Sequence, residues 1–365
     1  MFSTLLKFFP TPQFLAIPAV GLDISDRSIK LVDISKTHHH LALKRFTEID
    51  LPPGVIEAGV IKKPDLLVEA LRKLKKDHNL SSVVAALPEE LAYIVRLSLP
   101  ALSHQEMRRA IELQLDQYVP LPVNDVVFDY EVIGTPRAES GGRDVAVSVF
   151  PQKEASAYAS VLVEAGLTPL AFEIESQALA RACLVPADNT TTLILDIGKT
   201  RTGLGVVVRG SVALTSTIPN IGGRDMTRNI ERSLKVTTEE AERLKKERGL
   251  SRALDNEAVF TALIPMMSSL KDELTRVIEF WKTEQSQSDY HERPVEKIVV
   301  CGGQASLPGF VEYLSGQLNL PVFIGDPWTN ASEIVDLVPQ LSFEDSLRFS
   351  TAIGLALRAA HYKVK

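Results

Sequence analysis

The sequence predicts an α/β fold made of two related halves. Two segments about half a chain apart, residues 20–34 and 192–208, follow one pattern. In each, an apolar strand ends in an acid, Asp23 or Asp196, a tight turn of small residues follows, and the chain re-enters a β-branched strand. Strands alternate with helical stretches across both halves, which is typical of α/β proteins. We therefore expect two related domains that face each other.

A smaller α+β module interrupts the first half. The first hairpin is followed by a helix at about 63–78 and a strand at 82–87. Ser103 and Glu106 then form a capping box that starts a helix. The elements expected in this module are a strand at 91–97, a helix from 103 to about 118, a strand at 126–133, an exposed turn at 135–143, a strand at 144–150 and a helix at 152–165.

The second half repeats the alternation of strands and helices. Its hairpin is followed by the segment Ile221–Gly222–Gly223. The later elements expected are helices at about 225–234, 238–248 and 256–285, a strand at 298–300, a turn at Gly302–Gly303, and helices at about 309–318 and 345–361.

Composition excludes some classes of function. The 365 residues are 45% hydrophobic and 24% charged, and the formal net charge of −6 argues against a broad nucleic-acid-binding surface, which needs clustered positive charge. No stretch approaches the ~20 apolar residues that span a bilayer. Residues 1–18 are apolar and aromatic, but Lys7 and three prolines interrupt them, so they do not form a signal peptide. They are either an interfacial anchor or docking tail, or an arm packed on its own domain.

The paired hairpins have a chemical use. Backbone N–H groups in a tight turn can face a phosphate, and an acid at the end of the strand can hold a water on Mg²⁺. Asp23 and Asp196 fit this role, one from each half. Gly302 and Gly303 follow an apolar strand and let the backbone approach a flat ligand closely.

Together these segments resemble the phosphate-1, phosphate-2 and adenosine motifs of the actin–chaperone–sugar kinase superfamily. Further segments resemble one branch of it, the FtsA-related PilM family of type IV pilus assembly actin-like ATPases. Residues 221–227 are similar to its IGG-x-x-[LIM]-T segment and residues 240–245 to its E-x-A-E-x-L-K helix. The other similar segments are 87–102, 112–122, 173–182 and 353–358, so that the resemblance covers about 20–358.

The resemblance implies an actin-like ATPase fold, with two ribonuclease-H-like halves, an inserted 1C subdomain and a 2B subdomain. It implies an N-terminal extension at 1–19. The subdomains it implies are 1A at 20–90, 167–190 and 345–365, 1C at 91–166, 2A at 191–224 and 295–344, and 2B at 225–294.

The resemblance also implies ATP and Mg²⁺ as cofactors. The metal would lie near Asp23 and Asp196. Glu175 is the candidate catalytic residue that orients water; alternatively it is a helix-start acid interacting with the helix dipole. The nucleotide-binding residues expected are Asp23, Ser25, Ser28, Lys30, Asp196, Gly198, Thr200, Thr202, Gly222, Gly223, Glu242, Lys245, Gly302 and Gly303.

Two departures from the family pattern concern the turns. Asp26, in the first turn, would be repelled by a triphosphate unless it points outward or approaches the metal. In the second turn, Lys199 and Arg201 either add positive charge near phosphates or face solvent, and we favour solvent.

The implied partner is the N-terminal cytoplasmic peptide of a PilN-like inner-membrane protein, bound as an extended segment beside 1C, together with other pilus platform proteins. We expect no nucleic-acid partner, and a homo-oligomer stays open. The expected location is cytoplasmic and peripheral to the inner membrane, with membrane association indirect or through residues 1–18. ATP turnover is expected to be slow or absent.

Two alternatives are a nucleotide-free scaffold of the same platform and an FtsA-like cell-division filament protein. The FtsA family ends in a basic amphipathic helix after a linker, whereas here the last expected helix ends within a few residues of Lys365.

Overall fold

The computed structural model describes residues 18–36, 41–133, 141–186, 188–287, 293–331 and 341–361. The apolar segment 1–17 and most of the expected turn at 135–143 lie outside these ranges. No helix among the described residues combines the length and apolar character needed to cross a bilayer.

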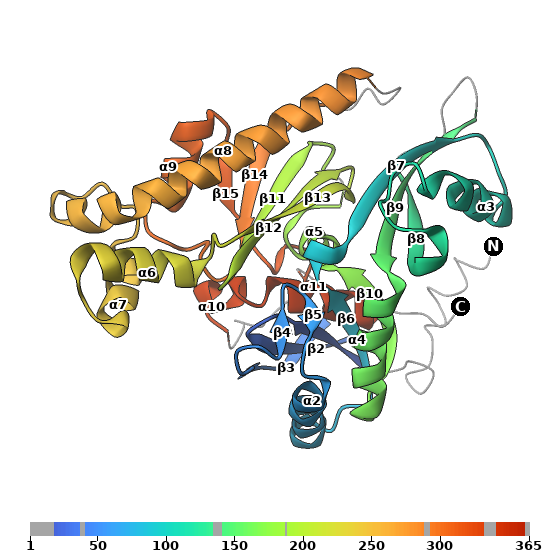
Figure 1. Ribbon diagram of the computed structural model, residues 1–365, viewed down its shortest axis with the longest axis horizontal. Coiled ribbons are helices and arrows are strands. Elements are labelled where there is room, and N and C mark those ends of the chain that lie inside the picture. Colours follow the sequence, from blue (N-terminus) through green and yellow to red (C-terminus); the bar gives the residue numbers. More distant parts are fainter. Residues whose placement is uncertain are drawn as a thin grey trace.

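Two five-stranded sheets of matching topology form the body of the described chain (Figure 1). The first runs in the order β10 (Thr168–Ile174), β6 (Ser82–Leu87), β1 (Ala19–Ile24), β2 (Ser28–Lys36) and β3 (Leu41–Asp50). The second runs β13 (Ser211–Pro219), β12 (Arg201–Val208), β11 (Thr192–Ile197), β14 (Lys297–Cys301) and β15 (Val322–Ile324). In each, three antiparallel strands continue into two parallel ones. The duplication predicted from the two hairpins is confirmed.

Two helices fill the space between the sheets. α5 (Glu175–Cys183) and α11 (Ser350–His361) pack together, α11 also lies on β1 and β2, and α5 contacts β12 and β13 (Figure 1). Glycines permit these close approaches, since a Cβ on Gly21 would lie 2.3 Å from the Ala352 carbonyl oxygen and one on Gly354 would lie 1.9 Å from that of Ala178. One apolar cluster, with residues such as Leu179, Ile194 and Phe349, therefore joins both halves.

The outer faces of the two sheets carry separate cores. α2 (Pro64–His78) and α4 (Gln152–Glu164) cover the first, beside the short hairpin of β4 (Ile56–Glu57) and β5 (Val60–Ile61). The helices in or beside the core of the second half are α6 (Gly223–Leu234), α7 (Thr238–Arg248), α8 (Glu257–Gln287), α9 (Phe310–Leu318) and α10 (Phe343–Leu347). Short 3₁₀ turns occur at η2 (Glu89–Leu91), η3 (Val123–Asp125), η4 (Leu254–Asn256) and η5 (Thr329–Ala331).

The inserted module is a three-stranded antiparallel sheet with its own core. Its strands run in the order β7 (Tyr93–Leu99), β9 (Arg143–Pro151), β8 (Val126–Ile133), and α3 (His104–Leu115) covers one face. The predicted Ser103–Glu106 capping box is present at the start of α3. α4, which the sequence grouped with this module, contacts β8 and β9 but also packs against α2 and contributes to the core of the first half. The division into subdomains stays a prediction.

Sequence periodicity missed several elements. It did not anticipate β10, β13 or β15. The single helix expected at about 345–361 was wrong, because the chain forms α10 and then α11, with a break that the Phe349 side chain uses to enter the core between the halves.

Candidate functional site

A cavity of about 1310 Å³ lies between the two halves. Residues from both matching hairpins line it, together with the starts of α5 and α6 and the turn after β14. The predicted residues that line it are Asp23, Ser25, Ser28, Lys30, Glu175, Asp196, Gly198, Thr200, Gly223, Glu242, Lys245, Gly302 and Gly303. The tertiary structure therefore gathers residues that are up to 280 positions apart (23 to 303) around one space.

Two predicted residues lie behind the wall of this cavity. The Thr202 side chain is buried, and its hydroxyl donates to the Ile221 carbonyl oxygen at 2.6 Å. A Cβ on Gly222 would lie 2.8 Å from the Arg201 nitrogen and from the Lys199 carbonyl carbon. Both residues connect the start of α6 to the turn between β11 and β12. They therefore determine the shape of that turn and do not line the cavity.

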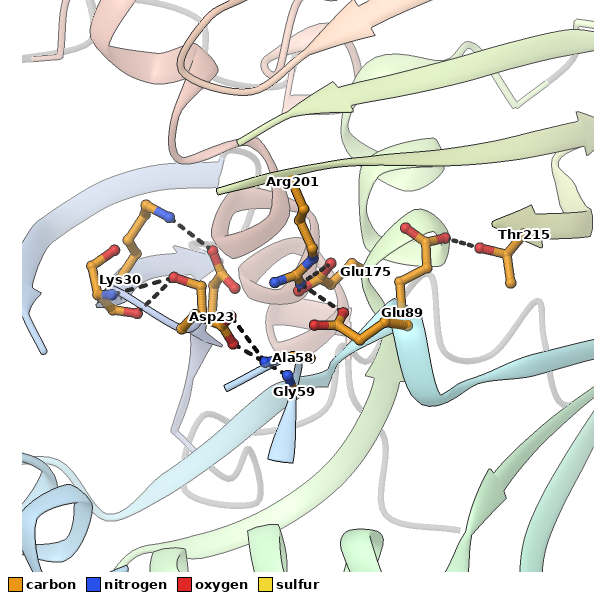
Figure 2. Close-up of polar contacts among 12 residues, drawn as sticks. Asp23, Lys30, Ala58, Gly59, Glu89, Glu175, Arg201 and Thr215 are labelled. Atoms are coloured by element: carbon orange, nitrogen blue, oxygen red, sulfur yellow. Dashed lines mark hydrogen bonds and ion pairs between the residues drawn. The ribbon is translucent and has the colours of Figure 1, made fainter. Parts of the chain in front are cut away.

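The two hairpin acids occupy equivalent positions at the ends of β1 and β11. Asp23 is buried and forms an ion pair with Lys30 across the hairpin, at 3.2 Å (Figure 2). Burial raises the pKa of Asp196, the Lys30 charge lowers it and the Asp23 charge raises it. Burial lowers the pKa of Lys30, but the Asp23 and Glu48 charges outweigh it and the net shift is upward. Two partly desolvated carboxylates beside each other fit a hydrated divalent cation, which would relieve their repulsion.

Asp26 lines the cavity, and backbone amides of the first half hold its carboxylate. Its carboxylate accepts hydrogen bonds from the backbone N–H groups of Ala58 and Gly59, each at 3.2 Å (Figure 2). These two amides come from the β4–β5 hairpin, which the sequence analysis did not anticipate. These two hydrogen bonds partly compensate the negative charge of Asp26, and its outward orientation considered from the sequence stays a prediction.

The lining of the cavity also includes polar side chains of α6 and α7 and a closely packed turn after β14. The buried Lys245 ammonium donates to Glu242 at 2.7 Å, to the Thr227 hydroxyl at 3.0 Å and to the Gly223 carbonyl oxygen at 3.1 Å. Burial lowers the pKa of Lys245, while Glu242 raises it. Gly302 has φ +86°, and a Cβ there would lie 2.2 Å from an Asp196 carboxylate oxygen. Only glycine fits this turn, which packs directly against the end of β11 at Asp196.

Glu175 is bound by an arginine that the sequence analysis placed in solvent. The Arg201 guanidinium donates to both carboxylate oxygens of Glu175, at 2.8 and 2.9 Å, and lies 3.1 Å from Glu90 (Figure 2). Burial raises the pKa of Glu175 and the Arg201 charge opposes this shift. The expectation for Arg201 was wrong because the turn directs it inward, toward the first half. Lys199, by contrast, is largely exposed.

Two acids in this region were missed. Glu89 and Glu90 follow β6, and Glu89 is buried and accepts a hydrogen bond from the Thr215 hydroxyl of β13 (Figure 2). Burial raises the pKa of Glu89 from its usual 4.5 to about 7. Two adjacent acids just beyond a buried strand, separated from it by Pro88, were the available signal.

A second cavity, of about 780 Å³, lies where the inserted module meets both halves. We call it the groove, and it is lined by β8, the end of β10, α5 and the turn between β12 and β13. β8 and β10 are edge strands of their sheets. The walls combine apolar side chains such as Val127, Phe172 and Leu184 with charged ones such as Arg181 and Glu131.

Comparison with known proteins decides the family. A family model described as "Type IV pilus assembly protein PilM" matches residues 21–360. The chain belongs to the PilM family. The resemblance drawn from the motifs is confirmed, and with it a role in type IV pilus assembly.

Solved structures confirm the actin-like fold of this PilM-family chain. A "PilM-PilN type IV pilus biogenesis complex" matches with a TM-score of 0.77 and 24% identity, over 94% of this chain and 99% of that chain. EutJ, an ethanolamine utilization protein from Carboxydothermus hydrogenoformans, matches with a TM-score of 0.53 and 19% identity, over 95% and 91%. MreB5 of Spiroplasma citri, bound to ADP, matches with a TM-score of 0.53 and 14% identity, over 93% and 98%.

Proposed function

We propose that this PilM-family protein binds ATP with Mg²⁺ in the cavity between its halves. The observation that carries the proposal is the convergence of Asp23 and Asp196, from matching hairpins, on one cavity with the Gly302 turn. The similar MreB5 structures are described as bound to ADP and to AMPPNP. The same fold there holds an adenine nucleotide, which supports the choice of ligand.

The residues divide into three roles. The turns with Ser25 and Ser28, and with Gly198 and Thr200, would hold the phosphates, with Lys30 supplying positive charge. Asp23 and Asp196 would hold water molecules on Mg²⁺, which supplies charge neutralisation for the phosphates. The nucleoside would lie along Gly223, Glu242, Lys245, Gly302 and Gly303.

Turnover would be slow in this arrangement. Glu175 faces the cavity where an attacking water would need orientation, but both of its oxygens accept from Arg201. With both oxygens engaged by Arg201, Glu175 would orient such a water poorly. The nucleotide would therefore serve mainly to set the conformation of the cleft.

Calorimetric titration with ATP and Mg²⁺ tests this proposal. We expect saturable binding to the unmodified protein and loss of binding in Asp196→Ala, because that variant removes one of the two acids. The matched control is Asp272→Ala, an exposed acid on α8 outside the cavity, which should bind like the unmodified protein. No binding at millimolar ATP would favour the nucleotide-free scaffold instead.

The groove is the proposed site of the partner. The similar structure named as a PilM–PilN complex supports a PilN-like protein as that partner. An extended peptide could add to the outer edge of β8 or β10 and place alternate side chains in apolar pockets. Binding to the N-terminal tail of such an inner-membrane protein would hold this chain at the cytoplasmic face of that membrane. The PilM family match favours this pilus role over an FtsA-like role in division.

A further inference from the structure

One cation of the second half is inserted among the acids of the first half. Arg201 opens β12 in the second sheet, whereas Glu175 opens α5 and Glu90 lies in η2, both in the first half. The side chains of Arg201, Glu90 and Glu175 are only 14%, 12% and 7% exposed. The contact therefore crosses the seam between the halves and is largely buried, at the wall of the cavity that Arg201 and Glu175 line (Figure 2).

The geometry ties this contact to the present arrangement of the halves. A single guanidinium nitrogen, Nη2 of Arg201, faces both oxygens of Glu175 and one oxygen of Glu90, so one cation of the second half holds two acids of the first. Burial lowers the pKa of Arg201. The negative charges of Glu175, Glu90 and Asp26 raise this pKa by more than burial lowers it, so the guanidinium keeps its charge. Separating the halves would leave this charge and two carboxylates without their partners until water reached them.

A second polar contact crosses the same seam. The Thr215 hydroxyl of β13 donates to Glu89, the neighbour of Glu90 in η2. A Cβ on Gly203, the second-half residue beside this acid, would lie 2.7 Å from its carboxylate. The backbone of β12 thus accommodates η2 closely, which places Arg201 beside Glu90 rather than in solvent.

We propose that Arg201, held by Glu175 and Glu90, is a latch that keeps the two halves closed and limits nucleotide exchange. The exchange part rests on the proposed nucleotide site; the closure part does not. Arg201 is a positioning residue in this scheme, because it acts through the arrangement of the halves. The competing explanation is a direct contact of Arg201 with a phosphate, since Arg201 also lines the cavity.

Glu90 separates these two explanations. It contacts Arg201 but does not line the cavity, so it has no access to a bound phosphate. If Arg201 is a latch, Glu90→Gln weakens it by removing one anion from the pair. If Arg201 contacts a phosphate, Glu90→Gln has little effect or strengthens binding, because it removes a competitor for the guanidinium.

The first test needs no nucleotide. Spin labels on Glu57→Cys and Glu239→Cys, two exposed positions in different halves, report the distance across the cleft by pulsed electron resonance. Cys183 and Cys301 are buried, which protects them from labelling. We expect one narrow, short distance in the otherwise unmodified chain and a shift to longer distances in Arg201→Gln and Glu90→Gln. The control is Arg72→Gln, which breaks an exposed arginine–glutamate pair within the first half and should change nothing.

The second test measures release of a fluorescent ADP after a chase with unlabelled ATP. We expect ADP release about tenfold faster in both Arg201→Gln and Glu90→Gln. This change corresponds to a barrier to release that is lower by about 1.4 kcal/mol. Wild-type distances and release rates in both variants would overturn the latch, and so would faster release in Arg201→Gln alone. Folding of each variant is checked by circular dichroism. If no nucleotide binds to the unmodified protein, the proposed function fails while the distance measurement still decides whether the latch exists.

Discussion

At the residue scale, the cleft depends on groups whose charge and size are set by burial. Gly302 must be glycine because its φ is positive and an Asp196 oxygen occupies the space a Cβ would need. Glu89 is a second case, because its carboxyl is buried beside the seam between the halves and hydrogen-bonded to Thr215. The charged groups that act on it are Asp196 in β11, which raises its pKa, and Arg201 in β12, which lowers it.

Glu89 should make stability depend on pH. Its folded-state pKa of about 7 exceeds the usual 4.5, so the folded chain binds the proton more tightly than the unfolded chain. The stabilising contribution is present below pH 4.5 and is lost as the pH rises through 7, in total about 3 kcal/mol. In Glu89→Gln, the loss of stability between pH 5 and pH 8 should be smaller than in the unmodified protein.

Thermal unfolding at several pH values measures this difference. Glu69→Gln, an exposed acid on α2, is the control and should follow the unmodified protein. An identical pH dependence in Glu89→Gln would show that Glu89 is ionised throughout this range.

At the element scale, α5 connects the two cavities. Glu175 at its start faces the nucleotide cavity, while Gln177, Ala180 and Arg181 along it line the groove. Glu173, just before the helix, pairs with both Arg181 and Arg358 of α11. These ion pairs fix α5 against α11 and give the groove a rigid wall.

The groove should be sensitive to changes on the edge of β8. Val127 lines it and is 41% exposed, so Val127→Asp adds a charge to the groove without disturbing the core. We expect this variant to bind the N-terminal peptide of a PilN-like protein at least about tenfold more weakly, because an apolar contact is replaced by a desolvated charge. Fluorescence anisotropy with the labelled peptide measures the affinity.

The matched control is Val163→Asp, on α4 outside the groove. Val163 is 63% exposed, so the same substitution should leave peptide affinity unchanged. Equal binding by Val127→Asp and the unmodified protein would place the peptide elsewhere on the molecule.

At the scale of the whole molecule, one apolar cluster joins the two halves, and both halves line the larger cavity. The cluster that contains Leu179, Ile194 and Phe349 belongs to both sheets, so a ligand between the halves acts on the stability of the entire chain. A ligand that binds only the folded state stabilises it in proportion to RT ln(1 + [L]/Kd).

Saturating ATP with Mg²⁺ should therefore raise the Tm. At 100 times Kd the gain is about 2.7 kcal/mol, which corresponds to a rise of about 3.5 °C for a chain of this size. Differential scanning fluorimetry should show this rise in the unmodified protein and not in Asp196→Ala. A rise of the same size in Asp196→Ala would mean that the nucleotide binds without the paired acids.

Much of the cleft was predictable because its residues follow local rules. Asp23 and Asp196 end apolar strands before tight turns, and Gly302 and Gly303 follow another strand, so position alone pointed to them. Glu89 and Glu90 lie beyond β6, after Pro88, and were missed because they do not end a strand as Asp23 and Asp196 do. Arg201 could not be placed at all, since its partners Glu90 and Glu175 are 111 and 26 positions away (201 − 90 and 201 − 175).

The sequence by itself determined the duplicated α/β fold, the PilM family and the residues around the cleft. It could do so because repeats, strand ends and glycine turns are local features. Only the tertiary structure decided that Arg201 crosses to the first half, that Asp26 is held by the β4–β5 amides and that α5 serves both cavities. These contacts join residues that are far apart in the sequence. They depend on how the two halves pack together, which cannot be deduced from any one segment.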